Sequence, residues 1–173
     1  LGRSLIELGI LFRIVGLADG QPALRKNFKA FTAADEYLNV DVFPVSFQFG
    51  DIAVALQLDP VKTISDAIRM QSALDDAGIQ SLLTKHKNNL QVLLAPLDPA
   101  DVEFITPELA LQILLSLKRS HDYVVVDAPP AFTEVILRAF DLADEYLLLT
   151  TLDNASLKNL KVTLGTLNAL GMP

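Results

Sequence analysis

Short apolar runs alternate along the chain with longer segments of helical periodicity. Three runs are almost continuously apolar: residues 90–95 (LQVLLA), 123–127 (YVVVD) and 146–151 (YLLLTT). Such runs are typical of strands that are buried on both faces of a parallel sheet. Residues 43–49 form a weaker fourth run, and residues 11–18 are a candidate first strand. We therefore expect several strands of one sheet.

Helix start and stop signals separate these runs. Thr63 and Asp66 form a capping box that predicts a helix to about residue 77, with Gly78 placed to end it. Thr106, followed by a first-turn proline, predicts the start of a second helix. Residues 133–142 fit a third helix. A last helix is predicted by leucines at helical spacing, namely Leu157, Leu160, Leu164 and Leu167.

The resulting order of strands and helices predicts an α/β fold. Strands that alternate with helices favour right-handed crossovers, a mostly parallel sheet and three α-β-α layers. Ligands of such sheets bind beyond the carboxyl ends of the strands. The candidate site residues therefore follow the apolar runs, at Pro96, 127–131 and 150–156.

Composition restricts the classes of function. The chain has 173 residues, of which 51% are hydrophobic, and this favours one globular domain with its own core. The net charge of -7 argues against a direct nucleic-acid partner, because sequence-independent binding needs clustered Lys and Arg. The absence of cysteine excludes disulfides and thiolate metal sites, and His86 and His121 are isolated and expected to be solvated.

The sequence predicts a cytoplasmic location. The longest apolar region, residues 5–17, is interrupted by Glu7 and Arg13 and is shorter than the roughly 20 residues that cross a bilayer. No secretory signal pattern is present. The chain begins without Met and stops directly after a helical pattern, so we expect the fold to be incomplete at both ends.

The segment DYVVVDAPP, residues 122–130, carries the most chemical information. A buried strand that ends in an acid is how P-loop nucleotidases place the Walker B carboxylate beside Mg²⁺. The alternative interpretation is that Asp127 only caps the loop after the strand.

Four segments together resemble a known family. DYVVVDAPP is followed by YLLLTTLDNASLKN and preceded by FQFGDIAVALQLDP and VLLAPLDP. Their order and spacing are similar to those of the deviant Walker A ATPases of the MinD/ParA superfamily, and most similar to its CpaE/TadZ pilus-assembly branch. The resemblance covers residues 45–173 and implies a P-loop NTPase-like fold that uses ATP and Mg²⁺.

The resemblance also implies roles for particular residues. Asp127 matches the Walker B aspartate, which holds the metal, and Pro129 and Pro130 match the loop that responds to the γ-phosphate. Asp51 matches the aspartate that positions the attacking water. Thr150, Thr151 and Ser156 match the segment after the next strand, near the nucleotide or the partner subunit. From the residues alone, the favoured interpretation of Asp51 is the N-cap of a short turn after Gly50, and that of Asp153 and Ser156 is the capping of the last helix.

Several departures concern nucleotide binding itself. No Gly-Lys-Ser/Thr sequence occurs in the chain, although the phosphate-binding loop of the family ends in it. The candidate loop after residues 11–18 contains Asp19 and Pro22, which offer repulsion and one amide donor fewer. Ala131 replaces the glycine that follows the two prolines in the family. Whether this chain is itself an enzyme is therefore left open.

Residues 1–44 carry no resemblance and stay unassigned. They fit an altered first βα unit, a remnant of a preceding receiver-like domain, or a reading-frame error. Two functional hypotheses follow from the whole sequence. One is an ATP-binding homodimeric switch that works with pilus or secretion proteins and reaches the inner membrane or cell pole only through these partners. The other is an interaction module that keeps the fold without nucleotide.

Overall fold

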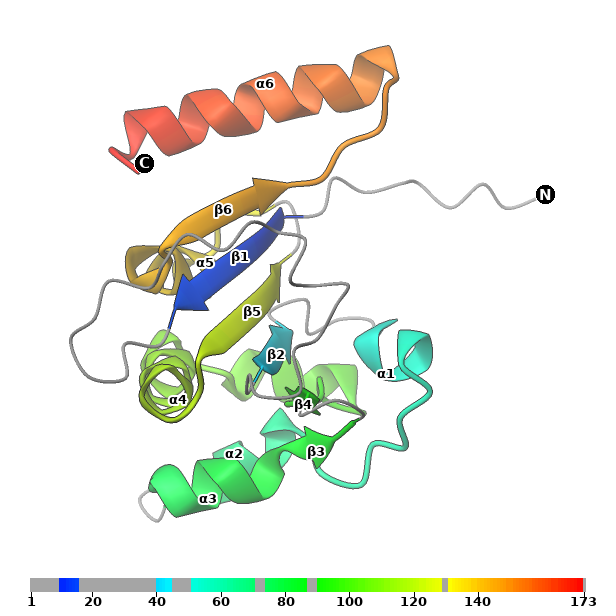
Figure 1. Cartoon of the computed structure of the whole chain (residues 1–173), viewed down its shortest axis with the longest axis vertical. Helices are drawn as coiled ribbons and strands as arrows, with labels where there is room; N and C mark the ends of the chain where they lie inside the picture. The colour runs from blue at the N-terminus through cyan, green and yellow to red at the C-terminus, as the bar shows by residue number, and fades with distance from the viewer. Residues whose placement is uncertain are drawn as a thin grey trace.

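The computed structural model describes residues 10–15, 40–44, 51–70, 74–86, 90–128 and 131–172. Its centre is a six-stranded sheet with the order β3-β4-β2-β5-β1-β6 (Figure 1). The strands are β1 Ile10–Val15, β2 Val40–Pro44, β3 Thr84–Lys85, β4 Leu90–Val92, β5 Tyr123–Ala128 and β6 Glu145–Leu148. The helices are α1 Asp51–Ala55, α2 Ile64–Met70, α3 Asp76–Leu82, α4 Pro107–Ser120, α5 Glu134–Leu142, α6 Asn154–Ala169 and the 3₁₀ helix η3 Pro99–Phe104.

The direction of the strands confirms most of the expected sheet. β2 pairs in parallel with both β4 and β5. β1 is antiparallel to both β5 and β6, so β6 runs in the same direction as β5. The three strands predicted from the longest apolar runs, β4, β5 and β6, thus share one direction, as expected of a mostly parallel sheet.

The N-terminal part of the chain joins this sheet in a way that the sequence did not predict. The candidate first strand is present as β1, but it lies antiparallel between β5 and β6. The fourth run was expected at residues 43–49, whereas β2 is Val40–Pro44 and residues 45–50 lie outside the described part. Both strands add to the sheet of the rest of the chain, which agrees with a single core.

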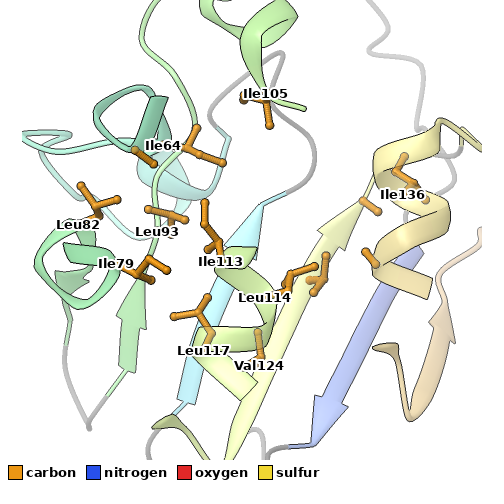
Figure 2. Close-up of a cluster of buried hydrophobic side chains, with 14 of the residues drawn as sticks. Ile64, Ile79, Leu82, Leu93, Ile105, Ile113, Leu114, Leu117, Val124 and Ile136 are labelled. Atoms are coloured by element: carbon orange, nitrogen blue, oxygen red, sulfur yellow. The ribbon is translucent and has the colours of Figure 1, made fainter. Parts of the chain in front are cut away.

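The core lies between β5 and the helices that cover one of its faces. Val124 and Val126 alternate along β5 and pack in one cluster with side chains of α4 and α5 (Figure 2). That cluster includes Ile113, Leu114, Leu117, Ile136, Ala139 and Phe140. Val125 faces the other way and is only 5% exposed, so both faces of β5 are covered. Full burial of each such side chain stabilises the fold by about 2 kcal/mol.

Side-chain caps explain where the long helices begin. The Thr106 hydroxyl accepts a hydrogen bond from the Leu109 amide at 3.2 Å, and Pro107 occupies the first turn of α4, as predicted. The Thr133 hydroxyl accepts from the Ile136 amide at 3.4 Å and so begins α5. The capping box at Thr63 is also confirmed, because the Thr63 amide donates to Asp66 at 2.9 Å.

The single helix predicted from Thr63 to about residue 77 is wrong. The structure has α2 and, after residues 71–73, a separate α3. Asp75 caps α3, and its carboxylate accepts a 2.7 Å hydrogen bond from the Gly78 amide. Gly78 therefore lies in the first turn of a helix and does not end one. The aspartate cap was the signal that the sequence interpretation missed.

Two further expectations need correction around β4. Thr84 and Lys85 form the short edge strand β3, antiparallel to β4, which the apolar pattern did not predict. His121 was expected to be solvated but is buried at the end of α4. Its ring nitrogens lie 2.9 Å from the Ser120 hydroxyl and 3.3 Å from the Gln91 side-chain nitrogen. His121 therefore helps to join α4 to the sheet.

Candidate functional site

Asp127 lies at the carboxyl end of β5, where the sequence placed it. Its register partners are Pro44, the last residue of β2, and Leu11 of β1. Because strand residues alternate between faces, Asp127 lies on the same face as Val125 and opposite the α4–α5 core. It is partly buried. A carboxylate at this position of a parallel sheet can reach a ligand beyond the sheet edge.

The other two predicted segments near Asp127 are only partly described. Asp51 is the first residue of α1, and β2, the strand that precedes α1, ends level with Asp127. This arrangement agrees with a common edge for both acids, but the Asp51 side chain lies outside the described part. Pro129 and Pro130 also lie outside it. The roles of these three residues stay predictions.

β6 ends on the same side of the sheet as β5, two strands away from it. Leu148 pairs with Ile10 of β1, and Ile10 pairs in turn with Ala128 of β5. Two strand spacings, or about 10 Å, separate Leu148 from Ala128 at the end of β5. Thr150 follows Leu148 by two residues. The sheet thus brings the predicted threonines and Asp127 to one edge.

The hydroxyl groups at this edge bond to the cap of α6. Asp153 accepts hydrogen bonds from the amides of Ala155 and Ser156, at 3.0 and 2.9 Å, and from the Ser156 hydroxyl at 2.7 Å. The Thr151 hydroxyl also donates to Asp153 and lies 2.7 Å from the Ser156 hydroxyl. The Thr150 hydroxyl donates to the Thr151 carbonyl at 3.2 Å.

This network changes the chemistry available there. The hydroxyl of Thr151, followed by the amide and hydroxyl of Ser156, holds the pKa of Asp153 well below its usual range. Asp153 therefore stays negative and occupies the amides that begin α6. An anionic ligand would have to compete with this carboxylate, so the capping interpretation of Asp153 and Ser156 describes what these residues do in the structure.

The direction of β1 bears on the phosphate-binding loop that the sequence suggested after this strand. β1 begins at the carboxyl end of β5, with Ile10 opposite Ala128. It ends at the amino end of β5, with Val15 opposite Tyr123. The last residue of β1 therefore lies at the end of the sheet away from Asp127. A loop placed after β1 in this arrangement cannot begin beside Asp127 and present amides to a phosphate there. The described residues offer the single carboxylate of Asp127 at this end of the sheet and do not fit a triphosphate.

The described part of the chain contains neither a cluster of metal ligands nor a membrane-spanning helix. Among residues 10–15, 40–44, 51–70, 74–86, 90–128 and 131–172, no group of three or more His, Cys, Asp or Glu side chains is arranged to hold a metal ion. In the same part of the chain, no helix has the length and hydropathy needed to span a bilayer.

The fold is similar to that of solved ATPases. A ParA-family ATPase of Chlorobium tepidum superposes with a TM-score of 0.71 at 21% identity, over 81% of this chain and 59% of that one. MinD of Pyrococcus horikoshii, complexed with Mg-ADP, gives 0.62 at 18% identity, over 79% and 55%. The cell division ATPase MinD of Pyrococcus furiosus gives 0.62 at 20% identity, over 79% and 56%.

The comparisons at the level of sequence are negative. No protein-family model matches the chain, and no curated protein is similar to it. The chain spans a little under 60% of the length of the three solved ATPases. At these identities the likeness concerns architecture, and it confirms the P-loop NTPase-like α/β class expected from the sequence. The chain has the fold of the ParA and MinD ATPases.

Proposed function

We propose that the chain is the core of an ATP-binding switch protein of the MinD/ParA type that serves pilus assembly, secretion or polar localisation. The observation that carries this proposal is the position of Asp127 at the carboxyl end of β5, level with the end of β2. The fold shared with ParA and MinD and the four sequence segments of the CpaE/TadZ branch support it.

In this proposal the acids and the proline loop read the state of a nucleotide. Bound Mg²⁺-ATP would supply the phosphate charge that such a switch responds to. Asp127 would hold the metal, Asp51 would position water, and Pro129 and Pro130 would move with the γ-phosphate. Thr150 and Thr151 would lie beside the nucleotide. The described residues lack a phosphate-holding loop, so we expect this chain by itself to bind ATP weakly at most.

The proposed partners follow from the same resemblance. The switch would act in the cytoplasm as a homodimer, contact pilus or secretion proteins, and reach the inner membrane or cell pole through them. The net charge of -7 supports a role without direct nucleic-acid contact.

A second candidate function is an interaction module that works without nucleotide. The specific observation in its favour is the reversed β1, whose last residue pairs with Tyr123 at the end of the sheet away from Asp127. The hydroxyl groups held by Asp153 also favour it. Such a module would keep the fold and its partner surfaces and would not respond to ATP.

Titration of the purified chain with ATP and Mg²⁺ tests both candidates. Backbone NMR shifts would be followed alongside calorimetry, with Asp127→Asn as the variant and Asp144→Asn, a partly exposed acid beyond α5, as the matched control. The switch predicts weak, Mg²⁺-dependent shifts near the ends of β5 and β6, with a dissociation constant on the order of 1 mM, lost in Asp127→Asn.

The other outcomes are equally informative. No shift at any ATP concentration would contradict the switch and support the nucleotide-free module. Saturable binding on the order of 1 μM would contradict our conclusion that the described residues do not fit a triphosphate.

A further inference from the structure

Two exposed surfaces of the chain combine apolar side chains with charges of opposite sign. The first, the α6 patch, consists of Leu157, Lys158, Lys161 and Leu164. Leu157 and Leu164 are 44% and 51% exposed although they continue the apolar stripe of the helix. Leu157, Lys161 and Leu164 follow one another at helical spacing, so a lysine lies between two leucines on one side of α6. Residues 154–173 contain no acidic residue.

The second surface, the η3 patch, consists of Leu97, Asp98, Asp101, Glu103 and Phe104. Leu97 and Phe104 are 70% and 61% exposed. Asp98, Asp101 and Phe104 are spaced three residues apart, so they share one side of the 3₁₀ helix. Residues 97–104 contain no basic residue. Within the described part of the chain, Lys158, Lys161, Asp101 and Glu103 make no ion pair.

The two patches match in size as well as in charge. Leu157 and Leu164 are separated by two helical turns, which is about 10 Å along α6. The six residues of η3 rise by about 12 Å, and Leu97 and Phe104 stand near its two ends. Each patch therefore presents two apolar side chains at a similar separation, with lysines between them on α6 and acids between them on η3.

One molecule cannot bring its own patches together. η3 follows β4, near one end of the sheet, and α6 follows β6, at the other end (Figure 1). Four strand steps separate β4 from β6, or about 19 Å. A contact between the patches must therefore join two molecules.

We propose that the α6 patch of one chain docks on the η3 patch of a second copy. Because the two surfaces differ, the contact is heterologous, and each molecule keeps one free patch of each kind. Association of this type continues beyond a dimer and forms open chains. It needs no nucleotide and is separate from the switch proposed above. The patches are small, so the expected dissociation constant is on the order of 0.1 mM at low salt.

Sedimentation velocity between about 0.01 and about 1 mM protein, without ATP, measures the association. The average mass should rise past that of a dimer with concentration, and it should fall when salt is raised, because exposed charges are screened. Leu164→Gln and Phe104→Gln should each weaken association by about tenfold or more, since both remove an apolar anchor. Leu170→Gln, at an exposed leucine that lies on another side of the helix from Leu157 and Leu164, is the matched control and should leave the association unchanged.

A mixture of the two variants gives the sharpest test. Leu164→Gln keeps an intact η3 patch and Phe104→Gln keeps an intact α6 patch, so mixing them should restore one contact and produce a 1:1 dimer that does not grow. Charge exchange gives a second readout: Lys161→Glu should abolish association, and Lys161→Glu combined with Asp101→Lys should recover it.

Three results would overturn the proposal. The first is an average mass that stays at that of one chain at all concentrations. The second is an association that Phe104→Gln does not weaken. The third is an unchanged chain that stops at a dimer, together with a mixture of the two variants that forms none.

Discussion

The two sides of β5 are built differently although they belong to one sheet. On the β2 side, the neighbouring strands run parallel to β5, and α2, α3 and α4 contribute buried side chains to a common core. On the β1 side, the neighbouring strand runs the opposite way, and α6 buries only Thr163 and Leu167. The first side follows the rules of a doubly wound α/β fold, and the second departs from them.

This difference concerns the end of the sheet at which Asp127 lies. The side with parallel strands carries Asp127 to the carboxyl end of β5, where ligands of such sheets bind. On the β1 side, the neighbouring strand begins opposite Ala128 and ends opposite Tyr123, so its carboxyl end lies away from Asp127. A shared fold therefore does not show which ligand a protein binds.

Disulfide crosslinking tests the direction of β1 relative to β5 most directly, because its outcome is all or none. Val15 pairs with Tyr123 in the antiparallel register, so a Val15→Cys/Tyr123→Cys chain should form a disulfide across about 5 Å between Cα atoms. Ile10 would lie beside Tyr123 only if β1 ran parallel to β5. In the structure these two residues are about 17 Å apart along the strand.

The Ile10→Cys/Tyr123→Cys chain is the matched control and should stay reduced. The natural chain contains no cysteine, so any disulfide comes from the introduced pair. Mass spectrometry of oxidised protein decides the result. A bond in the Ile10 pair and none in the Val15 pair would show that β1 runs parallel to β5.

The difference in packing predicts unequal costs for two leucines. Leu114→Ala removes a fully buried side chain between α4 and β5 and should lower the free energy of unfolding by about 2–5 kcal/mol. Leu167→Ala also removes a buried leucine, but on α6, which buries only Thr163 besides it, so the cost should lie at the low end of that range, about 2 kcal/mol. Urea unfolding of both variants measures this, and equal costs would remove the contrast between the two sides.

A smaller effect is expected where β6 joins α5. The Tyr146 hydroxyl donates to the Phe140 carbonyl at 2.9 Å, and the two rings meet edge to face with centroids 5.4 Å apart. Tyr146→Phe keeps the ring contact and should cost about 1 kcal/mol. An unchanged midpoint in urea would mean that the hydroxyl contributes nothing to this side of the sheet.

The same tyrosine has a predicted pH dependence. Burial, with Asp141 and Asp144 nearby, raises the pKa of Tyr146. A raised folded pKa means that this contribution to stability is present below about pH 10 and is lost as pH rises through the folded value. In an absorbance titration, Tyr146→Phe should remove a phenol that ionises above the ordinary tyrosine range; loss of a component within that range would contradict the assignment.

The smallest effect is local to the start of α6. The low pKa of Asp153 means that its contribution is present above about pH 4 and is lost only as pH falls through the lower folded value. Asp153→Ala should speed hydrogen exchange at the amides of Ala155 and Ser156 and leave global unfolding nearly unchanged. Asn154→Ala, at the next residue, is the control and should not change that exchange.

Much of the fold could be predicted because it depends on local patterns. The runs that became β4, β5 and β6 are apolar and short, and Thr106 and Thr133 mark helix starts by their capping chemistry. The direction of β1 could not be predicted in this way. An apolar run gives the same pattern in either direction, and only the chain that connects the strand decides which one forms.

The candidate site shows the same limit at the level of side chains. The position of Asp127 follows from the end of its strand, so the sequence predicted it. Thr151 and Ser156 were read from a family pattern, whereas the structure uses their hydroxyls to hold Asp153. Which of several nearby acceptors takes a hydroxyl depends on distances of a few tenths of an ångström, and spacing along the chain does not fix these.

The reversed β1 also orders the events of folding. Ile10 pairs with Ala128 and with Leu148, so the N-terminal strand finds its partners only in the last third of the chain. During synthesis from the N-terminus, β1 must wait until β5 and β6 have left the ribosome. Closing so long a loop is slow, because its entropy must be lost before the strand gains any hydrogen bond. We therefore expect β1 to join the sheet last, between β5 and β6.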